Sequence, residues 1–471
     1  MTSNIEKILS PTLIVILGAT GDLAQRKLLP SLLDLHERSL LPPAFRIIGF
    51  AKSVHTDESY REFVKETIDK KDHGHSAEAV EKFLACISYQ SGDFTVPESY
   101  GLLSELLITA ENSFGQCSNK LFYLAIPPTY YDTVFHNLAN SGLTIPCSNE
   151  TGWTRILVEK PFGKDIDTAR KLDETLGLLF KEEQIFRIDH YLGKETLQNI
   201  LMFRFSNLIF EPLWNNKYIE KVHIKLHETL GLEGRGAFYD GIGALRDVGQ
   251  NHILQMLAAV AMENPETLSA DRARTKRADV LSSLRPIAGE NLTKQVVRGQ
   301  YEGFLEEPSV NKESTTETYF KIETFIDNER WKGVPFVLEG GKGLTSKEAS
   351  ITIYFRETEK CLCLPETEQH HQNTLTFTMQ PNEGISVKFW VKKSGFDTDL
   401  EEADLSFTYP KASVIKIPDA YERILFDSIA GNQMLFTSTD EVSAAWNFIT
   451  PILSSWENTP LLKYKKGETP Q

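Results

Sequence analysis

The chain has 471 residues, with 50 Lys plus Arg against 65 Asp plus Glu, so its formal net charge at pH 7 is −15. A charge of this sign repels polyanions, which argues against a general nucleic-acid binder or membrane-surface binder. An apolar content of 41% and a charged content of 24% are ordinary for globular proteins and exclude the disordered and fibrous classes. An anionic small substrate is still compatible with this composition, because a few lysines can reverse the charge locally.

The chain shows no sign of export or of membrane insertion. It contains no run of about 18 apolar residues, so we expect no transmembrane helix. The N-terminal apolar run lacks a basic flank and leads into a glycine turn, which predicts a first strand and no signal peptide. Five cysteines are too few for a disulfide framework or a Cys-rich zinc site. Cys361 and Cys363 point the same way in a predicted strand, so metal binding or redox pairing there is the alternative. We expect a cytoplasmic protein without a metal.

In the first 190 residues, short apolar runs alternate with longer amphipathic stretches. Strands are predicted at Leu13–Leu17, Phe45–Phe50, Leu121–Ile126 and Arg155–Val158, and helices at Leu28–Leu41 and Glu58–Ile68. Continuous apolar strands between helices indicate a parallel sheet that is covered on both faces. We therefore predict an α/β, doubly wound (Rossmann-type) dinucleotide-binding domain over residues 1–190.

The remaining residues show strict alternation of apolar and polar side chains. Strands are predicted at Lys221–His227, Thr318–Phe325, Ser350–Phe355, Leu375–Met379 and Ile385–Val391, with a hairpin connection at Pro381–Gly384. Helices are predicted at Ile242–Met262, Ala420–Ile429 and Glu441–Trp446. This pattern predicts a larger α+β domain over residues 191–471, with a mainly antiparallel sheet that has one solvated face.

A glycine turn follows the first predicted strand. Its small residues at Gly18, Gly21 and Ala24 suit a tight turn, a close backbone approach to a pyrophosphate and close helix packing. The cofactor-binding residues expected in this turn are Gly18, Thr20, Gly21, Asp22 and Leu23. The spacing is not the strict G-x-G-x-x-G, so an ordinary strand–helix turn is the alternative.

Lys52 stands at the end of the second predicted strand, where NAD enzymes usually carry an acidic residue for the ribose hydroxyls. A cation followed by the hydroxyl of Ser53 suits a 2′-phosphate. We therefore predict NADP as the cofactor, with NAD as a secondary one. The alternative is that Lys52 is a solvated loop lysine.

Three further segments carry a family resemblance: Glu159-Lys160-Pro161-Phe162-Gly163, Arg187-Ile-Asp189-His190-Tyr191-Leu-Gly-Lys194-Glu195 and Arg246-Asp247-Val-Gly-Gln-Asn251-His252. Together with the glycine turn, and in this order, they resemble the glucose-6-phosphate dehydrogenase family. The resemblance extends over nearly the whole chain. The middle segment is highly specific to that family.

The resemblance implies a role for each matching residue. His252 is similar to the catalytic base of the family, and Asp189 to the carboxylate that orients it. The phosphate pocket is implied at His190, Tyr191, Lys194 and Lys347, and contacts to the sugar hydroxyls at Glu228, Asp247 and Lys342. Lys160 resembles the lysine between substrate and nicotinamide, and its Pro161 is commonly cis in the family. Tyr131 resembles a tyrosine on the cofactor side.

The resemblance implies oxidation of D-glucose 6-phosphate at C1 to 6-phospho-D-glucono-1,5-lactone with NADP, in the oxidative pentose phosphate pathway, by a homodimer or homotetramer. Two alternatives are a catalytically inactive NADP-binding regulatory paralogue and a sugar dehydrogenase of related two-domain layout. Two positions depart from the family pattern. Lys52 replaces the usual arginine, and Glu339 stands where the family commonly has the arginine of an Arg-Thr-Gly sequence.

Overall fold

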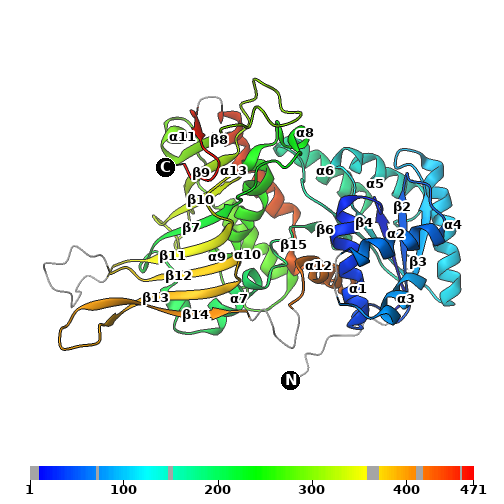
Figure 1. Ribbon diagram of the computed structural model, residues 1–471, viewed down its shortest axis with the longest axis horizontal. Helices are drawn as coiled ribbons and strands as arrows, with labels where there is room; N and C mark the ends of the chain where they lie inside the picture. Colours follow the sequence, from blue (N-terminus) through cyan, green and yellow to red (C-terminus); the bar gives the residue numbers. More distant parts are fainter. Residues whose placement is uncertain are drawn as a thin grey trace. The chain divides into compact units, whose positions relative to one another are not determined.

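The computed structural model describes residues 10–70, 74–146, 152–357, 371–409, 417–456 and 459–470. The chain forms two compact units (Figure 1). Unit 1 comprises Met1–Gly163, Asp167–Gly193 and Pro418–Thr439, and unit 2 comprises Lys164–Ile166, Lys194–Ile417 and Asp440–Gln471. A late segment of the chain, Pro418–Thr439, therefore belongs to the unit that the N-terminal residues begin.

Unit 1 is built on a seven-stranded sheet in the order β15-β6-β5-β4-β1-β2-β3. Its strands are β1 (Thr12–Leu17), β2 (Phe45–Ala51), β3 (Ile87–Ser91), β4 (Asn119–Leu124), β5 (Thr154–Val158), β6 (Ile185–Ile188) and β15 (Phe436–Thr437). All neighbours pair in parallel except β15, which pairs antiparallel with β6. This is the predicted doubly wound sheet, extended by one short strand from the C-terminal segment.

Helices cover both faces of the unit 1 sheet (Figure 1). They are η1 (Ala24–Leu28), α1 (Leu29–Glu37), α2 (Asp57–Asp69), α3 (Ala77–Ala85), α4 (Pro97–Phe114), η2 (Pro128–Tyr130), α5 (Tyr131–Asn140), α6 (Ile166–Leu179), η3 (Glu182–Gln184), α12 (Ala420–Ala430) and η6 (Gln433–Leu435). On one face, buried side chains of α1, α2, α3 and α12 form one hydrophobic cluster with Ile14 and Ile16 of β1. Leu13 and Val15 are also buried, which explains why this strand is apolar without alternation.

Unit 2 contains a nine-stranded sheet in the order β14-β13-β12-β11-β7-β10-β9-β8-β16. Its strands are β7 (Ile219–His227), β8 (Val296–Tyr301), β9 (Tyr319–Phe325), β10 (Pro335–Gly341), β11 (Glu348–Phe355), β12 (Thr374–Gln380), β13 (Gly384–Lys392), β14 (Leu400–Thr408) and β16 (Leu461–Tyr464). Pairing is antiparallel except between β7 and β10 and between β8 and β16. The sheet is thus mainly antiparallel, as predicted, with two parallel pairs that the alternation did not reveal.

The helices of unit 2 are α7 (Glu195–Ser206), η4 (Glu211–Leu213), α8 (Gly236–Tyr239), η5 (Leu245–Ile253), α9 (Leu254–Ala261), α10 (Ala270–Ser282), α11 (Glu290–Gln295) and α13 (Thr439–Ser454). The segment η5 is π-helical and continues into α9. Along β7, Val222, Ile224 and Leu226 are buried, while the alternating residues Lys221, His223 and Lys225 are half-buried. The alternation therefore reports one packed face and one open face of this sheet.

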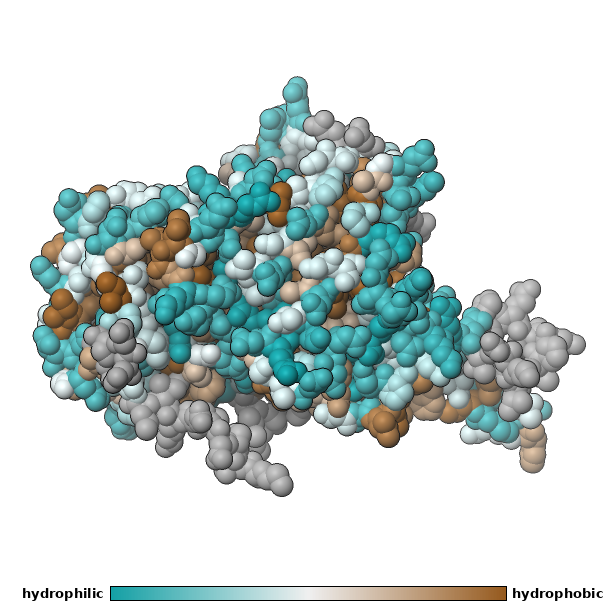
Figure 2. Space-filling view, turned by 180° about the vertical axis from the view of Figure 1, so that it is seen from behind, coloured by the Kyte–Doolittle hydropathy of each residue, from teal (hydrophilic) through white to brown (hydrophobic). Residues whose placement is uncertain are grey.

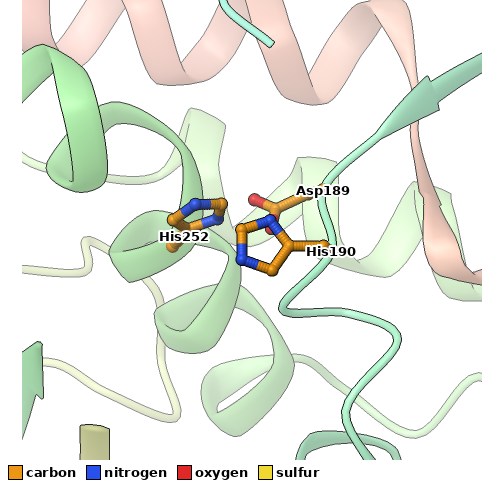
Figure 3. A group of neighbouring side chains, drawn as sticks. All are labelled: Asp189, His190 and His252. Carbon is orange, nitrogen blue, oxygen red and sulfur yellow. The ribbon is translucent and has the colours of Figure 1, made fainter. Parts of the chain in front are cut away.

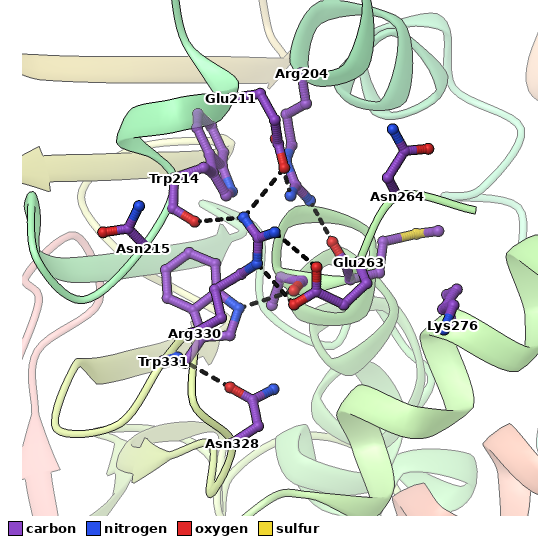
Figure 4. Close-up of polar contacts among 12 residues, drawn as sticks. Arg204, Glu211, Trp214, Asn215, Glu263, Asn264, Lys276, Asn328, Arg330 and Trp331 are labelled. Carbon is purple, nitrogen blue, oxygen red and sulfur yellow. Dashed lines mark hydrogen bonds and ion pairs between the residues drawn. The ribbon is translucent and has the colours of Figure 1, made fainter. Parts of the chain in front are cut away.

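Buried side chains hold the C-terminal end of α9, where carbonyl groups lack helical partners. Arg204 donates to the carbonyl oxygens of Val260 (2.9 Å) and Met262 (2.8 Å). The indole nitrogens of two tryptophans donate to the same turn at 2.8 Å: Trp214 to Val260 and Trp331 to Ala261. Ion pairs complete this network: Arg204 pairs with Glu211, and Arg330 pairs with both Glu211 and Glu263 (Figure 4). The helix end is thereby fixed in place.

The N-terminal end of η5 is held by Glu317, which is 2% exposed. Its carboxylate accepts hydrogen bonds from the backbone nitrogen of Leu245 (3.0 Å) and from the indole nitrogen of Trp456 (2.9 Å). A Cβ at Gly243 would lie 2.3 Å from the same carboxylate, so the chain can approach it closely only with glycine there. Both ends of the η5–α9 helix are therefore fixed by buried polar groups.

None of the helices in the described part of the chain combines the length and the apolar character needed to cross a bilayer. The face shown in Figure 2 is largely hydrophilic, with small hydrophobic groups between the polar side chains. Among the described cysteines, Cys86 is free and Cys117 is disulfide-bonded. Cys361 and Cys363 lie outside the described residues.

Candidate active site

The glycine turn between β1 and η1 has the close packing that its sequence predicts. Gly18 has φ +88°, and a Cβ there would lie 2.2 Å from the carbonyl oxygen of Ala125. The backbone nitrogen of Gly21 donates to the Gly18 carbonyl at 2.9 Å. Only glycine fits at position 18 of this tight turn. Without a side chain there, the backbone at the carboxyl edge of the sheet is open to the approach of a pyrophosphate. Asp22, expected beside the phosphates, is largely exposed and pairs with Arg26 at 2.7 Å.

The predicted NADP determinant, Lys52, follows β2 and is a partly exposed lysine with an acidic partner. Its Nζ lies 3.0 Å from Oδ2 of Asp93, which follows β3. The same ammonium is 5.9 Å from the centre of the Tyr130 ring. Thr20 and Ser53, from the ends of β1 and β2, are 3.3 Å apart between their hydroxyl oxygens. The ends of four neighbouring strands thus supply polar side chains to one region.

Lys160 follows β5, and the Lys160–Pro161 peptide bond is cis, as the resemblance implied. The preceding Glu159 accepts a hydrogen bond from the Tyr123 hydroxyl at 2.6 Å and another from Tyr421. Burial raises the pKa of Glu159 above its ordinary value. Tyr131, expected on the cofactor side, is 1% exposed and donates to the Glu159 carbonyl at 2.8 Å. Tyr131 therefore holds the backbone of the segment that carries Lys160. The tyrosine that lies next to Lys52 is its neighbour in the sequence, Tyr130.

Asp189, His190 and Tyr191 follow β6 directly. Asp189 is 2% exposed, and its Oδ1 accepts from the backbone nitrogen of Tyr191 at 3.0 Å. The His190 ring stacks on Tyr421, with ring centres 6.0 Å apart and an angle of 16° between the planes. Tyr421 therefore connects Glu159 with His190 inside unit 1. Lys194 is the N-cap of α7 and belongs to unit 2.

His252 lies on η5, the π-helical segment of unit 2, and is 2% exposed. Figure 3 shows its side chain on that helix, with Asp189 and His190 on the segment after β6. In a π-helix the hydrogen bonds run between residues five apart, so Asp247 and His252 are one turn apart on the same side. Asn251 donates from its amide to the Asp247 carbonyl at 3.0 Å and accepts from the His252 backbone nitrogen at 2.6 Å. Short π-helical segments often occur at functional sites.

The structure brings together the three residues expected to bind sugar hydroxyls. Lys342, which is 5% exposed, forms an ion pair with Glu228 and lies 3.4 Å from Oδ2 of Asp247. Glu228 follows β7 and Lys342 follows β10, and these two strands are parallel neighbours. Their carboxyl ends therefore meet, with the Tyr239 ring 5.4 Å from the lysine nitrogen. Lys347, the expected phosphate ligand, is exposed and directly precedes β11.

Glu339, which departs from the family pattern, is buried on β10. Its two carboxylate oxygens lie 2.8 Å from Nε2 of His223 and 3.2 Å from Nε2 of His227. The Tyr319 hydroxyl donates to it at 3.1 Å. Although burial opposes ionisation, the hydrogen bonds from the two histidines hold the pKa of Glu339 well below its usual range. The carboxylate that replaces the arginine of the family pattern is therefore held by local polar partners on β7 and β9.

Sequence reasoning missed three residues that support these groups: Asp93, Glu317 and Tyr421. Each lies far along the chain from the residue it contacts, so periodicity gives no signal of the contact. Tyr421 stands in the sequence Asp419-Ala-Tyr421-Glu422, and Asp419 and Glu422 form a capping box at the start of α12. That pattern predicts where the helix begins but not which residue its tyrosine meets.

Comparison with known proteins identifies the family. A family described as "Glucose-6-phosphate dehydrogenase, NAD binding domain" matches residues 15–199, and "Glucose-6-phosphate dehydrogenase, C-terminal domain" matches residues 201–470. The chain belongs to the glucose-6-phosphate dehydrogenase family.

Relatives and solved structures agree with this assignment over nearly the whole chain. Glucose-6-phosphate 1-dehydrogenase 5, cytoplasmic, from Arabidopsis thaliana is 40% identical, over 96% of this chain and 88% of the relative. The Aggregatibacter actinomycetemcomitans enzyme is 41% identical over 94% of this chain and 90% of its own. A structure described as glucose-6-phosphate dehydrogenase in complex with its substrate glucose-6-phosphate has a TM-score of 0.90 at 34% identity, covering 99% of this chain and 96% of that one. These similarities support glucose-6-phosphate 1-dehydrogenase activity.

Proposed function

We propose that this protein oxidises D-glucose 6-phosphate at C1 to 6-phospho-D-glucono-1,5-lactone, with NADP as the hydride acceptor. The observation that carries the proposal is the cluster of Lys342, Glu228 and Asp247, with His252 one helical turn from Asp247. A buried lysine between two carboxylates offers both donors and acceptors, which is what adjacent sugar hydroxyls need. The neighbouring imidazole can accept a proton from one of those hydroxyls.

The reaction removes the C1 hydrogen as hydride and the C1 hydroxyl proton, and leaves a carbonyl at C1. We propose that His252 takes the hydroxyl proton, because a neutral imidazole carries a ring nitrogen that can accept a proton. We further propose that Asp189 orients this ring and stabilises the imidazolium that forms. Such general-base help contributes about 10²–10⁴-fold to the rate.

The phosphate end of the substrate is assigned to His190, Tyr191, Lys194 and Lys347. The stacking of His190 on Tyr421 supports this assignment, because a ring held by packing can meet a phosphate without losing rotational freedom on binding. Binding energy from the remote phosphate then positions C1 for the reaction.

The glycine turn at Gly18 and Gly21 fits a dinucleotide, since a Cβ at Gly18 would collide with the Ala125 carbonyl and fill the turn. The nicotinamide, when bound, supplies the hydride acceptor. We propose that Lys52 binds the adenosine 2′-phosphate and that Lys160 lies between substrate and nicotinamide. The remaining expected contacts, at Thr20, Asp22, Leu23 and Tyr131, belong to the same proposal, although Tyr131 would act through the Glu159–Lys160 segment.

The test is reduced-nicotinamide absorbance with glucose 6-phosphate, using wild type, His252→Asn and the control His136→Asn. His136 is an exposed histidine of unit 1, so its variant measures the effect of losing a histidine elsewhere. We expect His252→Asn to lower kcat/KM by about 10²–10⁴-fold, with nucleotide binding retained, and His136→Asn to match wild type. A wild-type protein that binds NADP but does not oxidise glucose 6-phosphate contradicts the proposal.

We also propose that residues 1–190, joined in unit 1 by Pro418–Thr439, serve the cofactor, and that the rest of residues 191–471 serves the substrate and self-association. We propose further that the protein works in the cytoplasm as a homodimer or homotetramer. The half-buried lysines along β7 show that the sheet of unit 2 has an open face, which suits pairing with a second copy. Light scattering of the purified protein distinguishes the two assemblies, and a monomeric mass would contradict both.

A further inference from the structure

The surroundings of Lys52 contain an acidic residue that the sequence pattern did not indicate. Asp93 follows β3, the neighbour of β2, and reaches Lys52 with a 3.0 Å ion pair. The lysine is 54% exposed and the aspartate 35% exposed, so both side chains are within reach of a ligand from solvent. Dinucleotide enzymes that use NAD place a carboxylate at the end of the second strand, where this chain has Lys52, to accept hydrogen bonds from the adenosine ribose. Here the cation and the carboxylate are present together.

Asp93 is held in its position, independently of Lys52. Its Oδ1 accepts from the backbone nitrogen of Thr95 (2.9 Å) and from the Thr95 hydroxyl (2.8 Å). Its own backbone nitrogen donates to the Ser99 hydroxyl at 3.1 Å. These bonds leave Oδ2 directed at Lys52. The hydrogen bonds from Thr95, and then the one from Lys52, lower the pKa of Asp93 to about 2, so the carboxylate is ionised throughout the neutral range.

Lys52 is less fixed than Asp93. It is a long side chain whose described partners are Asp93 and the Tyr130 ring, 5.9 Å from the ammonium. A lysine also lacks the planar fork with which an arginine could bind a carboxylate and a phosphate at once. The ammonium must therefore divide its charge between Asp93 and any anion that binds beside it.

We propose that Asp93 sets the cofactor selectivity of this enzyme by competing for Lys52 and by accepting a hydrogen bond from an unphosphorylated ribose. The proposal rests on the proposed use of a nicotinamide dinucleotide at this edge of unit 1. With Asp93 in place, a 2′-phosphate meets a lysine that is already paired and a carboxylate that repels it. NAD meets an acceptor for its ribose hydroxyl. The residue therefore weakens the preference for NADP and allows NAD to be used.

The experiment measures equilibrium dissociation constants of the full-length protein for NADP and for NAD, by calorimetry and without glucose 6-phosphate. Asp93→Asn removes the charge but keeps an oxygen that can accept from Thr95. Glu98→Gln is the matched control, because it removes an exposed carboxylate five residues away in the first turn of α4. We expect Kd(NAD)/Kd(NADP) to rise about tenfold in Asp93→Asn, through the lost charge-assisted hydrogen bond and the removed repulsion. Glu98→Gln should leave the ratio within about twofold of wild type.

The double variant Lys52→Ala/Asp93→Asn separates the two parts of the effect. If Asp93 competes for Lys52, the gain in NADP affinity from Asp93→Asn is smaller when measured against Lys52→Ala, because only the repulsion of the phosphate is then removed, while the loss of NAD affinity persists. An unchanged ratio in Asp93→Asn, or an equal change in Glu98→Gln, overturns the proposal. A wild-type protein that binds neither dinucleotide instead refutes the proposed function, so the two failures are distinguishable.

Discussion

Removal of the Glu317 carboxylate should loosen the helix that carries the candidate base. Glu317→Ala takes away the acceptor for the Leu245 backbone nitrogen and for the Trp456 indole nitrogen. Both donors are buried with it. Leu245 begins η5, and Asp247, which is proposed to bind the substrate, follows two residues later. The substitution therefore acts first on the helical turn that carries Asp247.

The magnitude follows from the two donors that lose their partner. A buried donor without an acceptor costs about 1–3 kcal/mol, so two of them predict a loss of about 2–6 kcal/mol from the free energy of unfolding of unit 2. Glu317→Gln keeps one oxygen acceptor and should lose less than Glu317→Ala. Glu313→Ala, an exposed carboxylate of the same loop, should change the unfolding free energy by no more than about 0.5 kcal/mol.

Two assays test this expectation. Urea unfolding followed by tryptophan fluorescence reports the stability, because Trp456 itself contacts Glu317. Steady-state kinetics at a temperature where the variants stay folded should show a KM for glucose 6-phosphate raised about tenfold, with a smaller change in kcat. Glu317→Ala that unfolds like wild type, with an unchanged KM, would refute the reasoning.

Glu317 also gives a pH dependence with a defined sign. Burial raises the pKa of its carboxyl above the ordinary value, so the native state binds the proton more tightly than the unfolded state does. Stability from this group is therefore present at low pH and decreases as the pH rises through the raised pKa. The Glu317→Gln variant should lose this part of the pH dependence, measured as the slope of unfolding free energy against pH.

Three further variants test other parts of the structure. Gly18→Val should abolish NADP binding, because its Cβ would lie 2.2 Å from the Ala125 carbonyl; calorimetry showing wild-type affinity would contradict this. Arg277→Met removes the guanidinium that lies 2.7 Å from the buried carboxylate of Glu441, so urea unfolding should show a loss of up to about 3–5 kcal/mol, and a loss under 1 kcal/mol would argue against a stabilising ion pair. Lys342→Met brings two carboxylates together without their cation, and KM for glucose 6-phosphate should rise at least tenfold in steady-state assays while the affinity for NADP stays unchanged.

The sequence predicted those elements whose pattern is local. The apolar run of β1, the alternation of β7 and the helix over η5–α9 all appear in the structure near the predicted bounds. The parallel pairing of β7 with β10 was not predictable in this way, because it joins segments more than 100 residues apart. Alternation shows which face of a strand is buried but not which strand lies beside it.

In the candidate site, too, some residues were predicted from the sequence while their contacts with distant segments were not. The family resemblance, and no local pattern, implied roles for Glu228, Asp247 and Lys342, and the structure places Lys342 beside both carboxylates. The pairing of Lys52 with Asp93 was missed, because an ion pair between the ends of two neighbouring strands leaves no periodic trace in either segment. It changes the interpretation of Lys52 from a free cation to a shared one.

The return of Pro418–Thr439 to unit 1 has a consequence for how the protein is made. This segment supplies β15, which pairs with β6, and α12, whose side chains join the core beside β1. Arg155 of β5 donates to the carbonyls of Ser428 and Ile429 at 2.7 Å. During synthesis, the N-terminal unit must therefore wait for more than 200 further residues before its last strand and helix exist. Until then its core is open along one edge, so a fragment that ends near residue 200 should expose apolar surface and aggregate.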